Sequence, residues 1–190
     1  RLVTECAAQS GPDFVLIPGL EHRYKHGVHV LALGQSTWVT GSSAEAMLRA
    51  LTVDGCVLVA AHCATPTDLP HEVIEMCTAV EIWNVARDTR LLPTTRQVQV
   101  YRKWAESYAR LYAVGGLDMH KGTEWGCEVL LGSMCELTAA SVLEELRAGR
   151  FSTTSRLFSF GSRLGGGRKI AFAAGDALVG VRNLRDRVLR

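Results

Sequence analysis

Apolar runs of strand length recur along the chain, and they constrain its fold more than any other feature. The longest are FVLIPGL (14–20), VHVLAL (28–33), CVLVAA (56–61) and VEIW (80–83). Strands that are apolar on both faces are covered on both sides, as in the parallel sheets of α/β proteins. Helical spacing and capping signals predict helices at 44–53, 71–78, 95–112, 140–148 and 171–189. The sequence therefore predicts an α/β fold with parallel strands and not an antiparallel meander.

Composition places the chain among globular proteins and excludes several classes of partner. Its 190 residues, 47% hydrophobic and 21% charged, are enough for one domain with a substantial core. A net charge of +2 gives no basic surface that favours nucleic acid or an anionic membrane. No apolar run approaches the roughly 18 residues of a membrane span, and no signal-peptide pattern is present. The scattered cysteines, none in a C-x-x-C motif, indicate reduced thiols and a cytoplasmic location.

Polar side chains follow several of the predicted strands directly. Glu21, His62 and Asn84 each come immediately after an apolar run. Further along, the motif VGGLDMH places Asp118 and His120 two residues apart, so that in an extended segment they point the same way. The C-terminal ends of strands carry the active site in β/α barrels. Carboxylate and imidazole groups suit zinc, manganese or iron, so the sequence predicts a divalent metal site at these strand ends.

Each candidate also has a purely structural explanation. Loop carboxylates are commonly solvated, a histidine in an apolar run is usually a hydrogen-bonded core residue, and asparagine often bonds its own backbone. His29 lies inside its predicted strand and is interpreted as structural, whereas His22 and His26 are interpreted as solvated loop residues. Lys121 and Arg150 can hold an anionic substrate, although cations are common on any surface.

The motifs IPGLE, HVLALG, VLVAAH, EIWN, GGLDMH and LRAGRF, in this order, resemble the PHP domain. That is the polymerase and histidinol phosphatase superfamily of metal-dependent phosphoesterases. The resemblance implies a distorted (β/α)7 barrel, similar to a TIM barrel, with two or three divalent ions at the strand ends. It also implies that Glu21 bridges metal ions, with His62, Asp118 and His120 as further ligands. Asn84 matches a position that does not bind metal and is expected to lie near the substrate.

Two departures from the family pattern shape the expectations for this chain. Cys63 stands where proline is common, and the H-x-H segment that opens the family's fold would lie before Arg1. The chain is expected to form a partial barrel over residues 1–151, followed by a Gly- and Arg-rich linker (152–170) and a C-terminal helix (171–190). An incomplete ligand set predicts at most one tightly bound metal ion and weak activity. Open strand edges favour association, including a homo-oligomer.

The favoured functional hypothesis is hydrolysis of a small phosphate ester by a metal-activated water. Glu21 would hold the metal and His120 would protonate the leaving group. One alternative is a carbamate or amide hydrolase, which relies on the same chemistry. The other is a non-catalytic scaffold of the same fold that meets a partner through arginines of the last helix. These are Arg182, Arg185, Arg187 and Arg190.

Overall fold

The structure is a computed structural model that describes residues 2–24, 29–36, 39–63, 70–120, 122, 126–132, 136–165 and 169–188. The strands are β1 (Gly19–Arg23), β2 (His29–Leu33), β3 (Val57–Ala61), β4 (Ala79–Asn84), β5 (Tyr112–Gly116), β6 (Glu128–Leu131), β7 (Phe151–Thr154) and β8 (Ser159–Gly161). The helices are α1 (Leu2–Gln9), α2 (Ala44–Val53), α3 (His71–Ile74), α4 (Thr95–Ala105), α5 (Ala139–Ala148) and α6 (Lys169–Val188).

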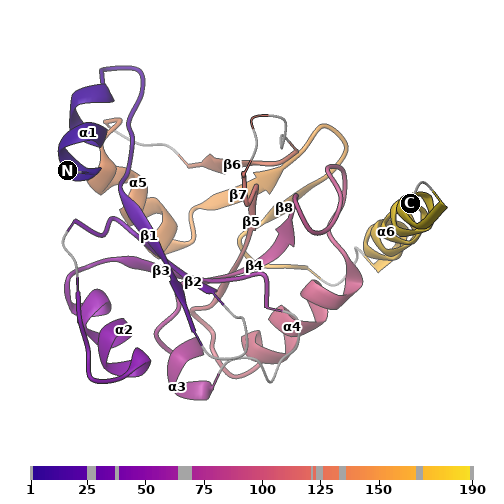
Figure 1. The fold of residues 1–190 in the computed structure, drawn as a ribbon, viewed down its shortest axis with the longest axis horizontal. Coiled ribbons are helices and arrows are strands. Elements are labelled where there is room, and N and C mark those ends of the chain that lie inside the picture. Colours follow the sequence, from indigo (N-terminus) through magenta and orange to yellow (C-terminus); the bar gives the residue numbers. More distant parts are fainter. Residues whose placement is uncertain are drawn as a thin grey trace.

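Five strands form a mixed sheet in the order β1-β2-β3-β4-β5 (Figure 1). β2 runs antiparallel to both β1 and β3, whereas β3, β4 and β5 run parallel. A second sheet, β6-β7-β8, is antiparallel throughout. Within the described residues both sheets are open and no barrel closes. The α/β class is confirmed, but the predicted partial or distorted (β/α)7 TIM-like barrel with parallel strands is wrong.

The strand direction was predicted wrongly because an apolar run shows burial and not direction. Apolar residues on both faces show that a strand is covered on both sides, and they carry no information about its direction. Only residues 24–28 connect β1 to β2. A connection of that length suits an antiparallel hairpin, because a parallel crossover needs about a dozen residues or more.

The first strand also begins later than its apolar run predicts. The run covers residues 14–20, but β1 starts at Gly19, directly after Pro18. Proline has no amide hydrogen for a sheet ladder, so it is suited to the position before a strand. Its carbonyl oxygen accepts a hydrogen bond from the amide of Gly34, with a nitrogen–oxygen distance of 2.7 Å. As a result Glu21 lies within β1, opposite Leu31, and does not follow the strand.

Alternating residues of the five-stranded sheet supply two separate cores. Val30, Leu58 and Ile82 belong to the larger core, which includes the buried residues of α2, α3 and α4. Val57 and Val59 belong to the smaller core, which includes residues of α5, β6 and β7. Figure 1 shows the same division, with α2, α3 and α4 on one side of the sheet and α5 and the small sheet on the other. The sheet is therefore covered on both faces, which explains the apolar runs.

Local signals place two helices as the sequence predicts. The hydroxyl of Ser43 caps α2 by accepting a hydrogen bond from the amide of Ala46. Thr138 caps α5 in the same way, and Gly149 ends that helix in a left-handed conformation with φ of 68°. The division of the chain near residue 151 stays a prediction. The polar segment that follows contributes most of β7 and all of β8, including the buried Phe160.

The last helix, α6, packs against α4 at the end of the molecule shown at the right of Figure 1. Neither α6 nor any other helix of the described chain is both long enough and apolar enough to cross a membrane.

Candidate metal centre

Histidine- and carboxylate-bearing segments meet at one edge of the five-stranded sheet. β3 and β4 are parallel and end at Ala61 and Asn84, so their C-terminal ends share this edge. β2 runs in the opposite direction, and its first residue, His29, pairs with Ala61. β1 pairs with β2 in the antiparallel direction, and this pairing places Glu21 opposite Leu31. The hairpin of β1 and β2 therefore brings two ligand-type side chains to the point where β3 gives way to His62.

The side chains of Glu21, His29 and His62 form a cluster that can hold a metal ion. Each offers one ligand atom, and these three atoms lie within 4.8 Å of one another. His29 Nδ1 and Glu21 Oε1 share a hydrogen bond, and His62 Nε2 lies 3.4 Å from the same oxygen. One carboxylate and two imidazoles suit zinc, manganese or iron(II). A three-ligand set of this kind leaves coordination positions for water or substrate.

His62 is the buried member of this cluster. Its side chain is 3% exposed, and its Nδ1 atom has no hydrogen-bond partner. A buried polar atom without a partner is uncommon, and this one is distinct from Nε2, the atom that approaches Glu21. Burial lowers the pKa of His62, and the charges of Arg87 and His29 lower it further. A lowered pKa favours the neutral imidazole, which is the form that binds a metal ion.

Two of the predicted site residues have strained backbones. His62 has a φ of 38° and Asp118 a φ of 49°, and among the described residues other than glycine only these two have a positive φ. Left-handed conformations cost side-chain-bearing residues roughly 1–2 kcal/mol. Such strain concentrates at functional sites, where the surrounding structure enforces it. Here it occurs at the two points where β3 and the segment after β5 leave the sheet.

The buried carboxyl group of Glu81 is linked to both strained segments, directly to His62 and through Asn84 to Asp118. Glu81 Oε2 accepts hydrogen bonds from the amide of His62, at 2.9 Å, and from the side-chain amide of Asn84, at 3.0 Å. The same Asn84 amide lies 3.2 Å from Asp118 Oδ2. Burial raises the pKa of Glu81 to about 7, against the opposing effect of these hydrogen bonds. Asn84, predicted to lie near substrate, is 1% exposed and links Glu81 to Asp118.

Asp118 and His120 line the same pocket as Glu21 and His62 but lie outside the three-ligand cluster. The pocket has a volume of ≈ 250 Å³. Asp118 Oδ2 lies 3.6 Å from Arg87 Nε. The side chain of His120 is 75% exposed, and its Nδ1 lies 2.8 Å from the carbonyl oxygen of Asp118. Of the four predicted ligands, the structure gathers Glu21 and His62 and leaves Asp118 and His120 on the pocket wall.

The sequence interpretation missed His29 as a candidate ligand. It placed His29 inside a predicted strand and not at a strand end, and therefore treated this residue as structural. Because β2 is antiparallel to β3, His29 instead lies beside the end of β3. The short connection at residues 24–28 was the signal that could have found it, since a hairpin there places His29 close to Glu21.

The other polar candidates have structural partners or lie outside the described residues. His22 is 9% exposed and hydrogen-bonded to Gln35, so the interpretation of a solvated residue is wrong. Arg150 pairs with the buried Glu145 at 2.8 Å. Arg182 donates to the carbonyl oxygen of Asp88 at 2.6 Å. Three further residues considered in the sequence analysis lie outside the described part of the chain. They are His26, Lys121 and Arg190.

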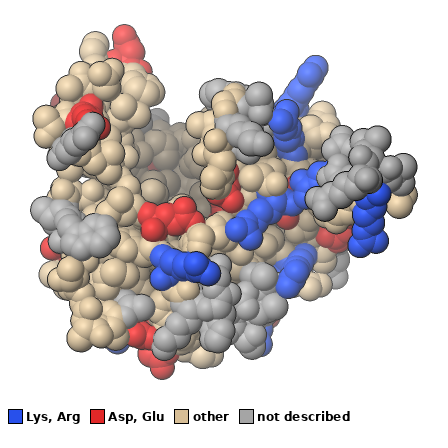
Figure 2. All heavy atoms as spheres, viewed as in Figure 1, with Lys and Arg blue, Asp and Glu red and all other residues tan. Residues whose placement is uncertain are grey.

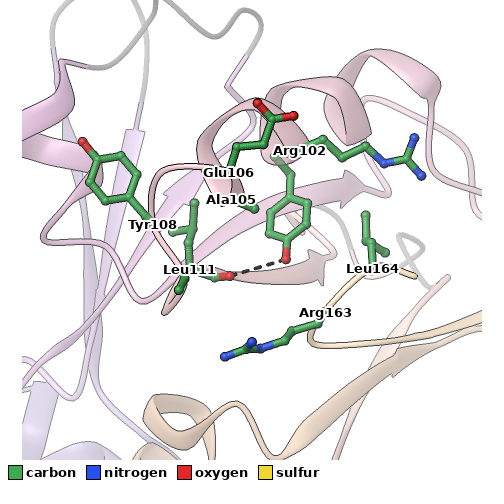
Figure 3. Close-up of a pocket in the computed structure, with 9 residues that line it drawn as sticks. Arg102, Ala105, Glu106, Tyr108, Leu111, Arg163 and Leu164 are labelled. Carbon is green, nitrogen blue, oxygen red and sulfur yellow. Dashed lines mark hydrogen bonds between the residues drawn. The ribbon is translucent and has the colours of Figure 1, made fainter. Parts of the chain in front are cut away.

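A larger pocket of ≈ 410 Å³ lies beside α4 and the segment after β8 (Figure 3). Its lining includes Arg102 and Arg163, but Figure 3 shows their guanidinium groups pointing away from each other. The hydroxyl of Tyr101 donates to the carbonyl oxygen of Leu111 within the same region. This pocket therefore gathers no set of ligand-type groups comparable to the cluster on β1, β2 and β3.

The surface view shows a recess between the part of the molecule that carries α1 and the part that carries β6, with acidic side chains at its border (Figure 2). Arginine or lysine side chains lie below these acidic groups on the same face. No protein-family model matches the chain. A search of curated proteins also finds no match. The geometry of the cluster is accordingly the basis on which a function is inferred.

Proposed function

We propose that this protein is a metal-dependent hydrolase that acts on phosphate esters, with one divalent ion held by Glu21, His29 and His62. The observation that carries the proposal is the gathering of these three ligand atoms within 4.8 Å at the edge of a pocket. The lowered pKa of the buried His62 adds support, since it favours the neutral imidazole that binds a metal ion.

The residues around the cluster have distinct roles in this proposal. When bound, a divalent ion supplies a water molecule of lowered pKa and positive charge for the phosphoryl oxygens. Glu81 holds the backbone of His62 through its hydrogen bond to the amide. Asp118, on the pocket wall, pairs with Arg87, whose positive charge acts on His62 and favours an anionic substrate near the cluster. His120, exposed on the pocket wall, protonates the leaving group.

Arg87 favours a phosphate over a carbamate or an amide, because neither of those substrates carries the negative charge that a guanidinium recognises. The scaffold alternative gains no support from Arg182, whose guanidinium is used inside the molecule on the carbonyl oxygens of Arg87 and Asp88. A carbamate is therefore tested as a second substrate, since its hydrolysis relies on the same activated water.

The experiment measures hydrolysis of p-nitrophenyl phosphate by protein loaded with zinc, manganese or iron(II), beside a matched p-nitrophenyl carbamate. We expect slow turnover of the phosphate that a chelator abolishes and that added metal restores. His62→Asn is the informative variant, because asparagine tolerates the left-handed backbone while removing the ligand nitrogen. His71→Asn is the matched control, since His71 is exposed on α3 and hydrogen-bonded to Tyr108.

The proposal predicts that His62→Asn loses both metal binding and turnover and that His71→Asn retains both. Turnover that survives complete chelation, or metal affinity that His62→Asn leaves unchanged, would overturn it. Faster hydrolysis of the carbamate than of the phosphate would retain the metal centre and replace the substrate class.

A further inference from the structure

An apolar slot lies directly beside the metal pocket, between the five-stranded sheet and α5. It has a volume of ≈ 250 Å³. Its walls come from β2, β3, β4, β5, β6 and α5, and every lining residue except Glu81 of β4 is aliphatic or glycine. The lining side chains include Leu33, Val114, Val129 and Leu146, which are partly exposed although they pack against the smaller core. The slot is therefore an opening in the apolar layer. Contact between its apolar surface and water is unfavourable.

The slot and the metal pocket share a wall. Leu31, Glu81 and Gly116 line both spaces. Gly116 is required at this junction, because a Cβ atom there would overlap the carboxylate of Glu81. Leu31 is also the residue that β1 pairs with Glu21, so one row of the sheet carries a metal ligand and the slot wall side by side. A molecule held at the metal cluster therefore has an apolar space within reach.

We propose that the substrate is a phosphate monoester of an apolar alcohol, whose hydrocarbon group enters this slot while its phosphate lies at the metal cluster. The inference rests on the proposed function, because it names the substrate class of the same site. A cavity of about 150 Å³ lined by aliphatic and aromatic residues accommodates benzene in another protein. The slot, at ≈ 250 Å³, is large enough for a benzene-sized ring or an alkyl group of comparable bulk.

The chemistry of the lining excludes more polar substituents. Glu81 supplies the only ionisable side chain of the slot, and no basic, amide or hydroxyl side chain lines it among the described residues. A sugar or a nucleoside would lose hydrogen bonds to water without finding replacements there, which is costly. An uncharged hydrocarbon group is the occupant that this lining fits.

The experiment uses a homologous series of alkyl compounds and two separate measurements. The first is the KM for hydrolysis of methyl, butyl and hexyl phosphate by the zinc-loaded protein. The second is calorimetric binding of methylphosphonate and hexylphosphonate, which resist hydrolysis. Each added methylene is expected to tighten binding about fourfold while the slot is being filled. The second measurement reports on the slot even if the protein hydrolyses nothing.

Val129→Phe fills the slot from β6 and is expected to bring the affinities for hexylphosphonate and methylphosphonate together. Because a larger side chain can disturb packing, Val142→Phe makes the same test from α5, and circular dichroism checks the fold of both variants. Val181→Phe is the matched control, since Val181 is 67% exposed on α6 and outside the slot. It should preserve the preference for hexylphosphonate.

The outcomes separate this inference from the proposed function. Equal affinity for methylphosphonate and hexylphosphonate, or a preference that both slot variants leave intact, overturns the inference even if phosphate esters are hydrolysed. Preferential binding of hexylphosphonate that the slot variants abolish supports the slot, even if no ester is hydrolysed and the hydrolase proposal fails.

Discussion

The imidazole rings of His29 and His62 meet edge to face, with their centroids 4.7 Å apart and their planes inclined at 70°. His29 begins β2 and His62 follows β3, and the antiparallel register pairs His29 with Ala61. The sheet hydrogen bonds therefore bring His29 beside the end of β3, and the turn that begins at His62 orients the second ring. Sites built on regular elements are held more precisely than sites on loops.

His29→Ala should weaken zinc binding strongly, whereas His120→Ala should leave it nearly unchanged. The reason is that His29 belongs to the three-ligand cluster and His120 does not. Loss of a direct ligand should exceed the roughly 10- to 100-fold cost of losing an outer partner. Isothermal titration with zinc measures both variants. An equal loss of affinity for the two would show that Asp118 and His120 close in around the ion, as the family resemblance implies.

The buried strands could be predicted from the sequence because a strand that is covered on both faces consists mostly of apolar residues. The cap at Ser43 and the helix end at Gly149 were also accessible, since both signals depend on neighbours along the chain. Strand direction was not accessible from the apolar runs, because a covered strand is apolar whichever way it runs. His29 was interpreted as structural because it lies inside an apolar run, and its place beside the end of β3 follows only from the antiparallel direction of β2.

The candidate site could be predicted in part for the same reason. Glu21 and His62 stand out because they interrupt apolar runs, and they do lie together. The partnership of Glu81 with His62 and Asn84 was not predicted, because Glu81 lies inside a run interpreted only as a strand. A charged residue in the middle of an otherwise apolar strand was the available signal, since such groups are seldom buried without a purpose.

Glu81→Gln should change how the stability of the metal-free protein depends on pH. The pKa of Glu81 is raised from 4.5 to about 7 by burial, so the folded protein holds this proton more tightly than the unfolded chain. The resulting stability is fully present below pH 4.5 and is lost as the pH rises through 7. The loss amounts to about 3 kcal/mol at most.

Urea unfolding in the presence of a chelator at pH 5 and pH 8 measures this effect. Between pH 5 and pH 8, Glu81→Gln should lose less stability than the wild type. Subtracting the two changes in unfolding free energy removes the contributions of other titrating groups. Glu75→Gln, at an exposed position, should follow the wild type. Parallel pH profiles for the wild type and Glu81→Gln would show that folding does not raise the pKa of Glu81.

Gly116→Ala should destabilise the protein and weaken metal binding together. A Cβ atom at this position would overlap the carboxylate of Glu81. The displaced carboxylate would lose its hydrogen bonds to His62 and Asn84 and leave the buried amide of His62 unpaired, at a cost of about 1–3 kcal/mol. Gly11→Ala is the matched control, since nothing lies within 4 Å of a Cβ atom there. Urea unfolding and zinc titration of both variants would reveal an error if they behaved alike.

His62→Gly should be more stable than His62→Ala when metal is absent. His62 has a φ of 38°, a conformation that alanine adopts only with strain and glycine adopts freely. The expected advantage of glycine is about 1 kcal/mol, which reverses the usual order of these two residues. Urea unfolding in a chelator compares the pair without any contribution from ligand loss.

The exposed Gln99, within α4, provides the opposite reference. Gln99→Ala should be more stable than Gln99→Gly by about 1 kcal/mol, because glycine is a poor helix former. A reversal of sign between the two positions is the specific signature of a left-handed backbone at His62. If alanine were favoured at both positions, the strained turn after β3 would not be a property of the protein in solution. The orientation that turns His62 toward Glu21 and His29 would then require a bound ion.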